Sequence, residues 1–178
     1  MEQQCFITLA EHSKKPLVSD WPNNGKTLTD AEAEAEAEAE AESKNIGLLL
    51  GKKSGILDVD LDCIAAKALA DVILPEPAVK FDRGSPDSGH YLYKATSFGS
   101  RKSFTSDKSG STLVELRGDG AQTMIPPSVH PNGNKLSFTA LNEAANLVEY
   151  ADLLKAVNLP AACSEIAQSW QDGIRHDL

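Results

Sequence analysis

The chain has 178 residues, 41% of them hydrophobic, which is enough to bury the core of one domain. Its net charge of −9 argues against nucleic-acid binding, but six glutamates in a single run between residues 32 and 42 contribute much of that charge. No apolar run approaches the roughly 20 residues that cross a bilayer, and residues 1–10 lack the basic segment of a signal peptide. The three cysteines lie far apart, so they indicate neither a zinc site nor a disulfide framework, and they fit a cytoplasmic protein.

A low-complexity run occupies much of the N-terminal part of the chain. Residues 27–44 are predicted to form a helix, because Ala and Glu alternate from Ala31 to Glu42 and both residues favour helices over strands. Thr29 and Glu32 form a capping box that would start this helix. Such a repeat is typical of an exposed helix without a role in function.

Short strands and one helix are predicted next. Residues 45–51 form an apolar run bounded by turn residues, which predicts a buried strand, and residues 56–60 predict a second strand paired with it in a hairpin. Apolar residues at helical spacing between Cys63 and Leu74 predict an amphipathic helix that ends before Pro75.

The rest of the chain is predicted to contain further strands, a loop and two helices. The expected elements are a strand pair at 79–81 and 89–94, a basic mobile loop at 96–111, a hairpin at 112–117 and 121–125, a short strand to residue 138, and helices at 142–157 and 161–170. We therefore expect one domain over residues 1–140 and C-terminal helices over residues 141–178.

Three aspartates alternate with apolar residues in and just after the strand predicted at 56–60. Because side chains alternate along a strand, Asp58, Asp60 and Asp62 would leave the same face, roughly 6.6–7 Å apart. One interpretation is a solvated edge strand whose charges prevent pairing with other strands. The other is that the carboxylates converge in a cleft, where a divalent cation would offset their repulsion.

Two further segments carry residues suited to the same chemistry. Ser88-Gly89-His90 stands at the start of one predicted strand, and Glu115 and Arg117 share a face of another. Carboxylates from neighbouring strands suit Mg²⁺ or Mn²⁺, and two such ions would hold the attacking and leaving oxygens of a phosphoryl transfer. His90 and Arg117 would then bind the triphosphate. Each feature alone is ordinary, since a single histidine or an outward-facing glutamate usually has no catalytic role.

Several motifs, in this order, resemble the bifunctional primase–polymerase (prim-pol) domain of the archaeo-eukaryotic primase superfamily, which occurs in plasmid and phage replication proteins. They are Asn-Ile-Gly-Leu-Leu-Leu-Gly from Asn45, Leu-Asp-Val-Asp from Leu57, Ser-Gly-His-Tyr-Leu-Tyr from Ser88, Val-Glu-Leu-Arg-Gly-Asp-Gly from Val114, and Pro-Pro-Ser-Val-His-Pro-Asn-Gly from Pro126. Lys15-Pro16-Leu17 and Trp21 also match the family's opening segment, so the resemblance covers about residues 12 to 140.

The resemblance implies an α+β prim-pol fold. In this fold a modified RNA-recognition-motif-like sheet, antiparallel or mixed, lies beside an N-terminal α/β unit and is followed by C-terminal helices. The resemblance also implies a DNA primase and polymerase that joins nucleoside triphosphates on a single-stranded DNA template, with two Mg²⁺ or Mn²⁺ ions. The residues that match the family's site are the metal-binding acids Asp58, Asp60 and Glu115, the catalytic and phosphate-contacting His90, and the nucleotide-binding Ser88, Arg117 and Ser128.

Three positions depart from the family's usual pattern. No basic residue directly precedes His90, the third acid is Glu115 where Asp is frequent, and only Leu136 and Phe138 follow the Pro-Pro-Ser turn, where two aromatic residues are usual. Residues 170–178 resemble the start of a helical domain that often follows prim-pol domains. We therefore hypothesise that the chain belongs to a longer replication protein with a helicase domain downstream.

Three other interpretations remain open at this point. A non-catalytic module that binds nucleotide or single-stranded DNA is favoured by the acidic composition and by the absence of a basic residue before His90. A Toprim-type phosphotransferase would need a glutamate on a strand upstream of Asp58, and none of the upstream glutamates lies in a convincing strand. The last interpretation is a plain α/β domain with unrelated acids.

Overall fold

The structure is a computed structural model that describes residues 4–27, 29–31 and 44–176. The predicted helix of alternating Ala and Glu lies almost entirely outside the described residues. Of its start, residues 29–31 are helical, and the side chain that caps them is not that of Thr29: the backbone N–H of Asp30 donates to Oγ1 of Thr27 over 3.2 Å.

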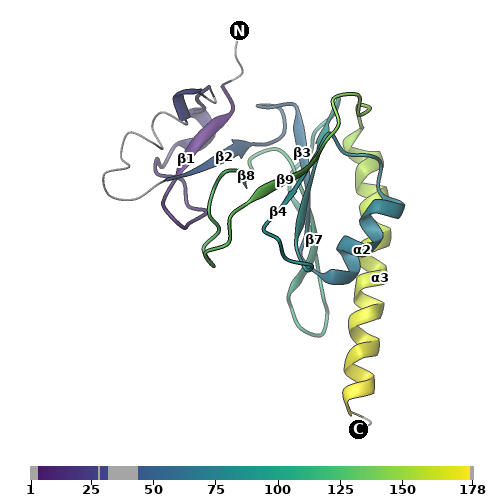
Figure 1. Cartoon of the computed structure of the whole chain (residues 1–178). Helices are drawn as coiled ribbons and strands as arrows, with labels where there is room; N and C mark the ends of the chain where they lie inside the picture. The colour runs from purple at the N-terminus through teal and green to yellow at the C-terminus, as the bar shows by residue number, and fades with distance from the viewer. Residues whose placement is uncertain (1–3, 28, 32–43, 177–178) are drawn as a thin grey trace.

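The strands of the described residues form two antiparallel sheets. In spatial order, the three-stranded sheet contains β1 (Phe6–Leu9), β2 (Asn45–Leu49) and β8 (Gln122–Ile125). The six-stranded sheet contains, also in spatial order, β6 (Lys102–Thr105), β7 (Thr112–Arg117), β3 (Ile56–Leu61), β5 (Gly89–Lys94), β4 (Val79–Asp82) and β9 (Ser137–Leu141). The three-stranded sheet lies on one side of the six-stranded sheet (Figure 1), so the space between the sheets is lined by residues distant in sequence.

Two α-helices cover the opposite side of the six-stranded sheet (Figure 1). The helix α2 (Ile64–Ile73) begins where the Cys63 sulfur accepts the N–H of Ala66, and the helix α3 (Tyr150–His176) runs on through Pro160. A short 3₁₀ helix, η1 (Trp21–Asn23), lies near the N-terminus. Together these elements confirm the predicted α+β fold class with a helical C-terminus.

Two helices were predicted near the C-terminus, where the structure has one. Residues 142–149 are not helical, and α3 is continuous over the predicted break near Pro160. A proline inside a helix removes one backbone hydrogen bond, which does not have to end the helix. Over the described residues, no helix is both long and apolar enough to cross a membrane.

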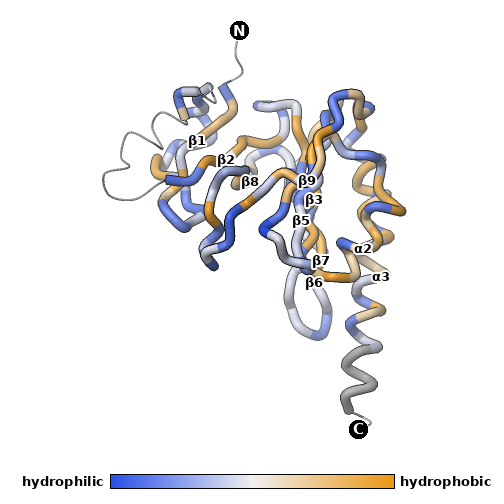
Figure 2. Tube along the Cα trace, in the orientation of Figure 1, coloured by the Kyte–Doolittle hydropathy of each residue, from blue (hydrophilic) through white to orange (hydrophobic). Residues whose placement is uncertain are grey.

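Each side of the six-stranded sheet packs a separate hydrophobic core. Leu57, Val59 and Leu61 of β3 face α2 and α3, where they join buried residues such as Leu153 and Val157. The core between the two sheets instead contains apolar residues of both sheets, including Ile7, Leu49, Phe81, Leu92 and Ile125. Figure 2 shows hydrophobic residues on α2 and on the part of α3 beside the sheet. The alternation read from the sequence therefore separates the two sides of one sheet.

Neither predicted hairpin outside the 79–94 region forms. Strands β2 and β3 lie in different sheets and are joined by a single bridge between Gly51 and Ile56, and β7 and β8 are likewise in different sheets. Each turn thus passes the chain from one sheet to the other. At the first turn Gly51 has a φ of 72°, and Asp119 of the second turn packs against it, so that no Cβ would fit. The basic loop predicted at 96–111 contains β6, which pairs with β7.

Candidate active site

The antiparallel register brings the predicted acids together. Asp60 on β3 lies opposite His90 on β5 and opposite Glu115 on β7, while Asp58 lies opposite Arg117. Directly opposed residues of neighbouring antiparallel strands point to the same face. All five side chains therefore lie on the face of the six-stranded sheet that is turned toward the three-stranded sheet. This arrangement follows from strand pairing alone.

His90 links the two aspartates of β3. Its Nδ1 lies 3.1 Å from Oδ2 of Asp58, and its Nε2 lies 3.5 Å from Oδ1 of Asp60. Asp58 is completely buried. Burial acts to raise the pKa of Asp58, but the charge of His90, the hydrogen bond from His90 and the charge of Arg117 outweigh it and lower that pKa. The pKa of His90 is raised: burial opposes this, and the carboxylates of Asp60 and Asp58 outweigh it.

Arg117 is the second cation of the cluster. It forms an ion pair with Asp60, its Nε donates to Oε2 of Glu115 over 2.8 Å, and one of its terminal nitrogens lies 3.9 Å from Asp58. Glu115 also accepts the hydroxyl of Ser103 over 2.6 Å. Burial acts to raise the pKa of Glu115, but the hydrogen bonds from Ser103 and Arg117 lower it overall. Hydrogen bonds and neighbouring cations thus favour the ionised forms of Asp58 and Glu115.

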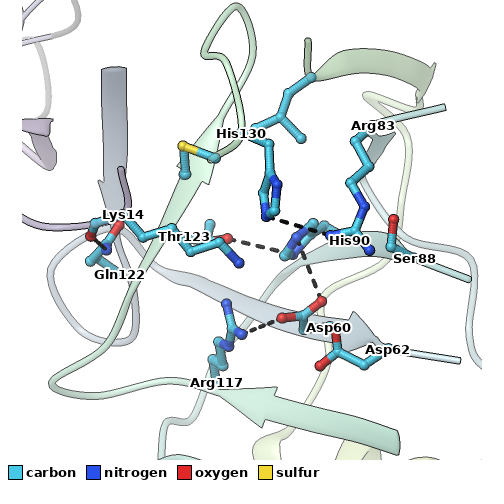
Figure 3. Close-up of a pocket in the computed structure, with 12 residues that line it drawn as sticks. Lys14, Asp60, Asp62, Arg83, Ser88, His90, Arg117, Gln122, Thr123 and His130 are labelled. Carbon is cyan, nitrogen blue, oxygen red and sulfur yellow. Dashed lines mark hydrogen bonds and ion pairs between the residues drawn. The ribbon is translucent and has the colours of Figure 1, made fainter. Parts of the chain in front are cut away.

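A pocket opens directly beside this cluster, between the two sheets (Figure 3). Its walls come from β3, β5 and β7 of the large sheet, from β8 of the small sheet, and from the segments after β1, β4 and β8. The polar residues that line it are Lys14, Asp60, Asp62, Arg83, Ser88, His90, Arg117, Gln122, Thr123 and His130. Asp58 and Glu115 lie behind this lining, in contact with His90 and Arg117.

Several polar atoms of the pocket wall lack a partner. Within the described residues, Oγ of Ser88, Nε of Arg83 and Oε1 of Gln122 are buried without any hydrogen bond. Buried polar atoms are normally paired, so unpaired atoms that gather at one pocket indicate a polar ligand. Lys14 and Arg83 add positive charge to the same wall. The unpaired donors of Ser88 and Arg83 and these two positive charges favour an anionic ligand such as a phosphate group, whereas Oε1 of Gln122 can only accept a hydrogen bond.

His130 lies on the side of the pocket near Arg83, with its Nε2 3.5 Å from Nη1 of Arg83 (Figure 3). Burial lowers the pKa of His130, so this imidazole is neutral at pH 7 and acts as a hydrogen-bonding group. On the opposite wall, Thr123 lies within 3.5 Å of Nδ1 of His90. Asp62 stands at the edge of the same pocket, where the loss of part of its surrounding water and the charge of Asp60 raise its pKa to about 6.

Like Asp58 and Glu115, Ser128 does not line the pocket, and its own hydrogen bonds lead to β2 and not to the acids. Its Oγ accepts the backbone N–H of Ile46 over 2.9 Å and donates to the carbonyl of the same residue over 3.3 Å. The neighbouring Val129 is held by Asn45, whose Oδ1 accepts its N–H over 2.8 Å. Ser128 thus fixes the turn after β8 against β2, and that turn carries His130 to the pocket.

The pocket residues absent from the predicted set include Lys14, Arg83, Thr123 and His130. Two of them had a signal in the sequence. His130 stands within the Pro-Pro-Ser-Val-His segment that resembles the family, and Lys14 directly precedes the Lys15-Pro16-Leu17 segment that matches the family's opening. Arg83 and Thr123 had none, because their positions depend on how the two sheets face each other.

The donor chemistry at the acids fits a hard cation, since three carboxylates meet on adjacent strands. In the described residues, however, no three side chains of His, Cys, Asp or Glu form a ready metal site. Arg117 and His90 pair with the carboxylates that would act as ligands. The residues therefore supply suitable ligands, but binding of a cation at Asp60 and Glu115 requires Arg117 to release them.

The fold is an α+β domain with buried acids beside a pocket. The pocket wall carries positive charge and polar atoms without a hydrogen-bond partner, as expected of a protein that binds phosphorylated ligands. Residues 4–152 match the family Prim-Pol, described as "Bifunctional DNA primase/polymerase, N-terminal". The chain belongs to this family and contains a domain of the primase/polymerase type. No curated protein matches the chain.

Proposed function

We propose that this chain is a metal-dependent nucleotidyltransferase that extends a primer on a single-stranded DNA template during plasmid or phage replication. The observation that carries the proposal is the cross-strand group of Asp60, His90 and Glu115, which the register aligns beside the pocket. Membership of the primase/polymerase family supports the same reaction.

The pocket wall would bind the triphosphate of the incoming nucleotide. Lys14 and Arg83 supply positive charge, and the unpaired hydroxyl of Ser88 supplies a donor at the start of β5. The carboxylates of Asp60 and Asp58 raise the pKa of His90 against the effect of its burial, which favours the protonated imidazole. A protonated imidazole beside these groups adds a further donor to phosphate oxygens. Ionic and hydrogen-bonding partners would thus surround the phosphates before the reaction.

Asp58, Asp60 and Glu115 would hold Mg²⁺ or Mn²⁺, in two ions as the family resemblance implies. Such ions neutralise the charge of the phosphates and activate the attacking oxygen. In their absence Arg117 neutralises Asp60 and Glu115, which keeps these buried carboxylates compensated. Arg117 also lines the pocket, so a guanidinium released from Asp60 and Glu115 would be placed to bind a phosphate oxygen there.

Primer extension tests the proposal. The double variant Asp58→Asn, Asp60→Asn keeps the size of both side chains and removes their charge. We expect wild-type protein to incorporate nucleotides with Mg²⁺ or Mn²⁺, and the double variant to lose at least about a thousandfold of that rate, because ligand and charge are both lost. Asp152→Asn, on the exposed surface of α3, is the matched control and should retain full activity. Incorporation by the double variant at the wild-type rate would refute the proposal.

A non-catalytic module that binds nucleotide or single-stranded DNA is the second candidate. The observation that favours it is the pairing of the acids with Arg117 and His90, which leaves no ready metal site among the described residues. This candidate predicts that nucleoside triphosphates bind with the same affinity with and without divalent cations, and that neither Mg²⁺ nor Mn²⁺ supports incorporation. Calorimetric titration combined with the extension assay separates the two functions.

A further inference from the structure

The row of residues that contains the acids continues to the edge of the sheet. His90 lies opposite Phe81 on β4, and Phe81 lies opposite Phe138 on β9. The rings of Phe81 and His90 are stacked, with centroids 4.6 Å apart and an interplanar angle of 11°. Phe138 meets Phe81 edge to face, with centroids 6.3 Å apart. Aromatic contacts thus connect the imidazole of the site to the last strand of the sheet.

Phe138 differs from the other rings of this row in its exposure. Phe81 is 1% exposed, whereas Phe138 is 51% exposed. The adjacent apolar side chain on this face is Leu141, which lies opposite Val79 and is 69% exposed. A single exposed apolar residue needs no explanation, but two on the same edge strand form an apolar surface that continues the inter-sheet core.

Two basic residues lie close to Phe138 along the paired strands. The exposed Lys135 stands three positions before Phe138 in the chain, and Arg83 directly follows Asp82, which lies opposite Ser137 of β9. Phe81 is packed between Phe138 and His90, so only Phe81 and His90 separate the exposed ring from Asp60 along this row. An exposed aromatic ring next to cations is the combination with which proteins bind single-stranded nucleic acid: bases stack on the ring and phosphates pair with the cations.

We propose that the exposed ring of Phe138 is a stacking surface for a base of single-stranded DNA bound across β9. Phe81 supports the ring from the interior, and Leu141 extends the apolar surface along the strand. We assign this surface to single-stranded DNA and not to the incoming nucleotide, because the pocket wall already offers unpaired polar atoms to the phosphates of a nucleotide. The choice of DNA as ligand rests on the proposed function, and the stacking does not depend on catalysis.

Binding of two oligonucleotides tests the inference. One is a single-stranded DNA of mixed sequence, and the other has the same length but consists of abasic sites, so that only its backbone can bind. Wild-type protein should prefer the first. Phe138→Ala should bind the base-containing strand about tenfold more weakly and the abasic strand as before, because only stacking is lost. Phe138→Trp should retain the preference.

Trp170→Ala is the matched control, since Trp170 is an exposed aromatic residue of α3, on the other side of the sheet. It should bind both strands as the wild type does. Equal binding of the base-containing strand by wild type and Phe138→Ala would overturn the inference. So would an equal loss for both strands, a loss confined to free nucleoside triphosphate, or a change of oligomeric state, which would assign β9 to a contact between chains.

The double variant Asp58→Asn, Asp60→Asn separates this inference from the proposed function. If the stacking is correct, the double variant still prefers the base-containing strand, and the preference again disappears when Phe138→Ala is added. A wild-type protein that lacks incorporation but shows this preference would refute catalysis and leave the stacking surface intact.

Discussion

The two faces of the six-stranded sheet are built from alternate residues of the same strands, yet they differ in chemistry. Val59 and Asp58 are neighbours in β3 and both are completely buried. Val59 packs against α2 and α3, whereas Asp58 faces the small sheet with His90 and Arg117. One face is held by apolar contacts and the other by compensated charges. The comparison shows which buried residues contribute to folding and which are retained at a cost.

The cost on the charged face is electrostatic. Burying carboxylates is unfavourable unless cations and hydrogen bonds replace water, and breaking one buried pair leaves the remaining charge uncompensated. On the apolar face, removal of a side chain leaves only a cavity. The two faces should therefore respond differently to substitution, both in stability and in activity.

The largest effect on stability is expected at Arg117. Arg117→Met removes the cation that neutralises Asp60 and Glu115 and should lower the free energy of unfolding by about 3–5 kcal/mol. Because the carboxylates are then free, Mg²⁺ should raise the melting temperature of the variant more than that of the wild type. Thermal unfolding with and without Mg²⁺ measures both effects.

Arg101→Met is the matched control for this prediction. Arg101 also pairs with Glu115, over 3.2 Å, but its side chain is largely exposed, so its loss should cost less than about 1 kcal/mol. If Arg117→Met were as stable as Arg101→Met, the charges of this face would not need compensation and the proposed contrast would fail.

The apolar face is tested next to the same residue. Leu116→Ala removes a fully buried side chain of β7 and should destabilise the protein by about 3 kcal/mol, since a cavity remains in the core against the helices. The fraction that stays folded should incorporate nucleotides at the wild-type rate. Glu115→Gln, one position earlier on the opposite face, should instead lose most of the incorporation rate and lose less stability than Leu116→Ala. Denaturant titration together with primer extension at a temperature where both variants are folded makes the comparison.

The contrast between the faces was already present in the sequence. The alternation of Asp58, Asp60 and Asp62 with apolar residues predicted that the acids share one face of a strand. The spacing of motifs then predicted that His90 and Glu115 belong with them, and the register places both opposite Asp60. The alternation along each strand was sufficient to predict the shared face, because directly opposed residues of neighbouring strands point to the same side of the sheet.

Features that depend on two sheets could not be predicted in this way. The apolar run at 45–51 and the turn after it resemble a hairpin, and only the three-dimensional packing shows that β2 pairs with β1 and β8. The same applies to Arg83 and Thr123, which meet at the pocket from different sheets. The ion pair between Arg117 and Asp60 was likewise not predicted. From the sequence, Arg117 was expected to bind phosphate, and the structure places its guanidinium against Asp60.

A smaller effect is expected at Ser128. Ser128→Ala leaves the backbone N–H of Ile46 without its acceptor and should cost about 1–2 kcal/mol, measured by denaturant titration. If Ser128 acts only through this contact, the affinity for nucleoside triphosphate should change little. An unchanged stability with a clearly raised KM would instead favour the direct nucleotide contact that the family resemblance implies.

A small effect on stability is also expected at Lys67, through which α2 holds the pocket from the apolar side of the sheet. Lys67 of α2 donates from Nζ to Asp82 over 2.8 Å and to the carbonyl of Ser85 over 2.9 Å, and thereby fixes the loop that carries Arg83 and Ser88. Lys67→Met should cost about 1 kcal/mol of stability.

The same substitution should also act on the reaction, because Lys67 fixes pocket residues without lining the pocket. We expect Lys67→Met to raise the KM for nucleoside triphosphate severalfold with little change in kcat, since the phosphate-binding residues lose their position but the acids do not. Lys80→Met is the matched control: Lys80 forms an ion pair of equal length, 2.8 Å, with Asp71 of α2, away from that loop. Equal KM values for the two variants would show that the apolar side of the sheet contributes stability alone, whereas a rise confined to Lys67→Met would show that it also positions the pocket.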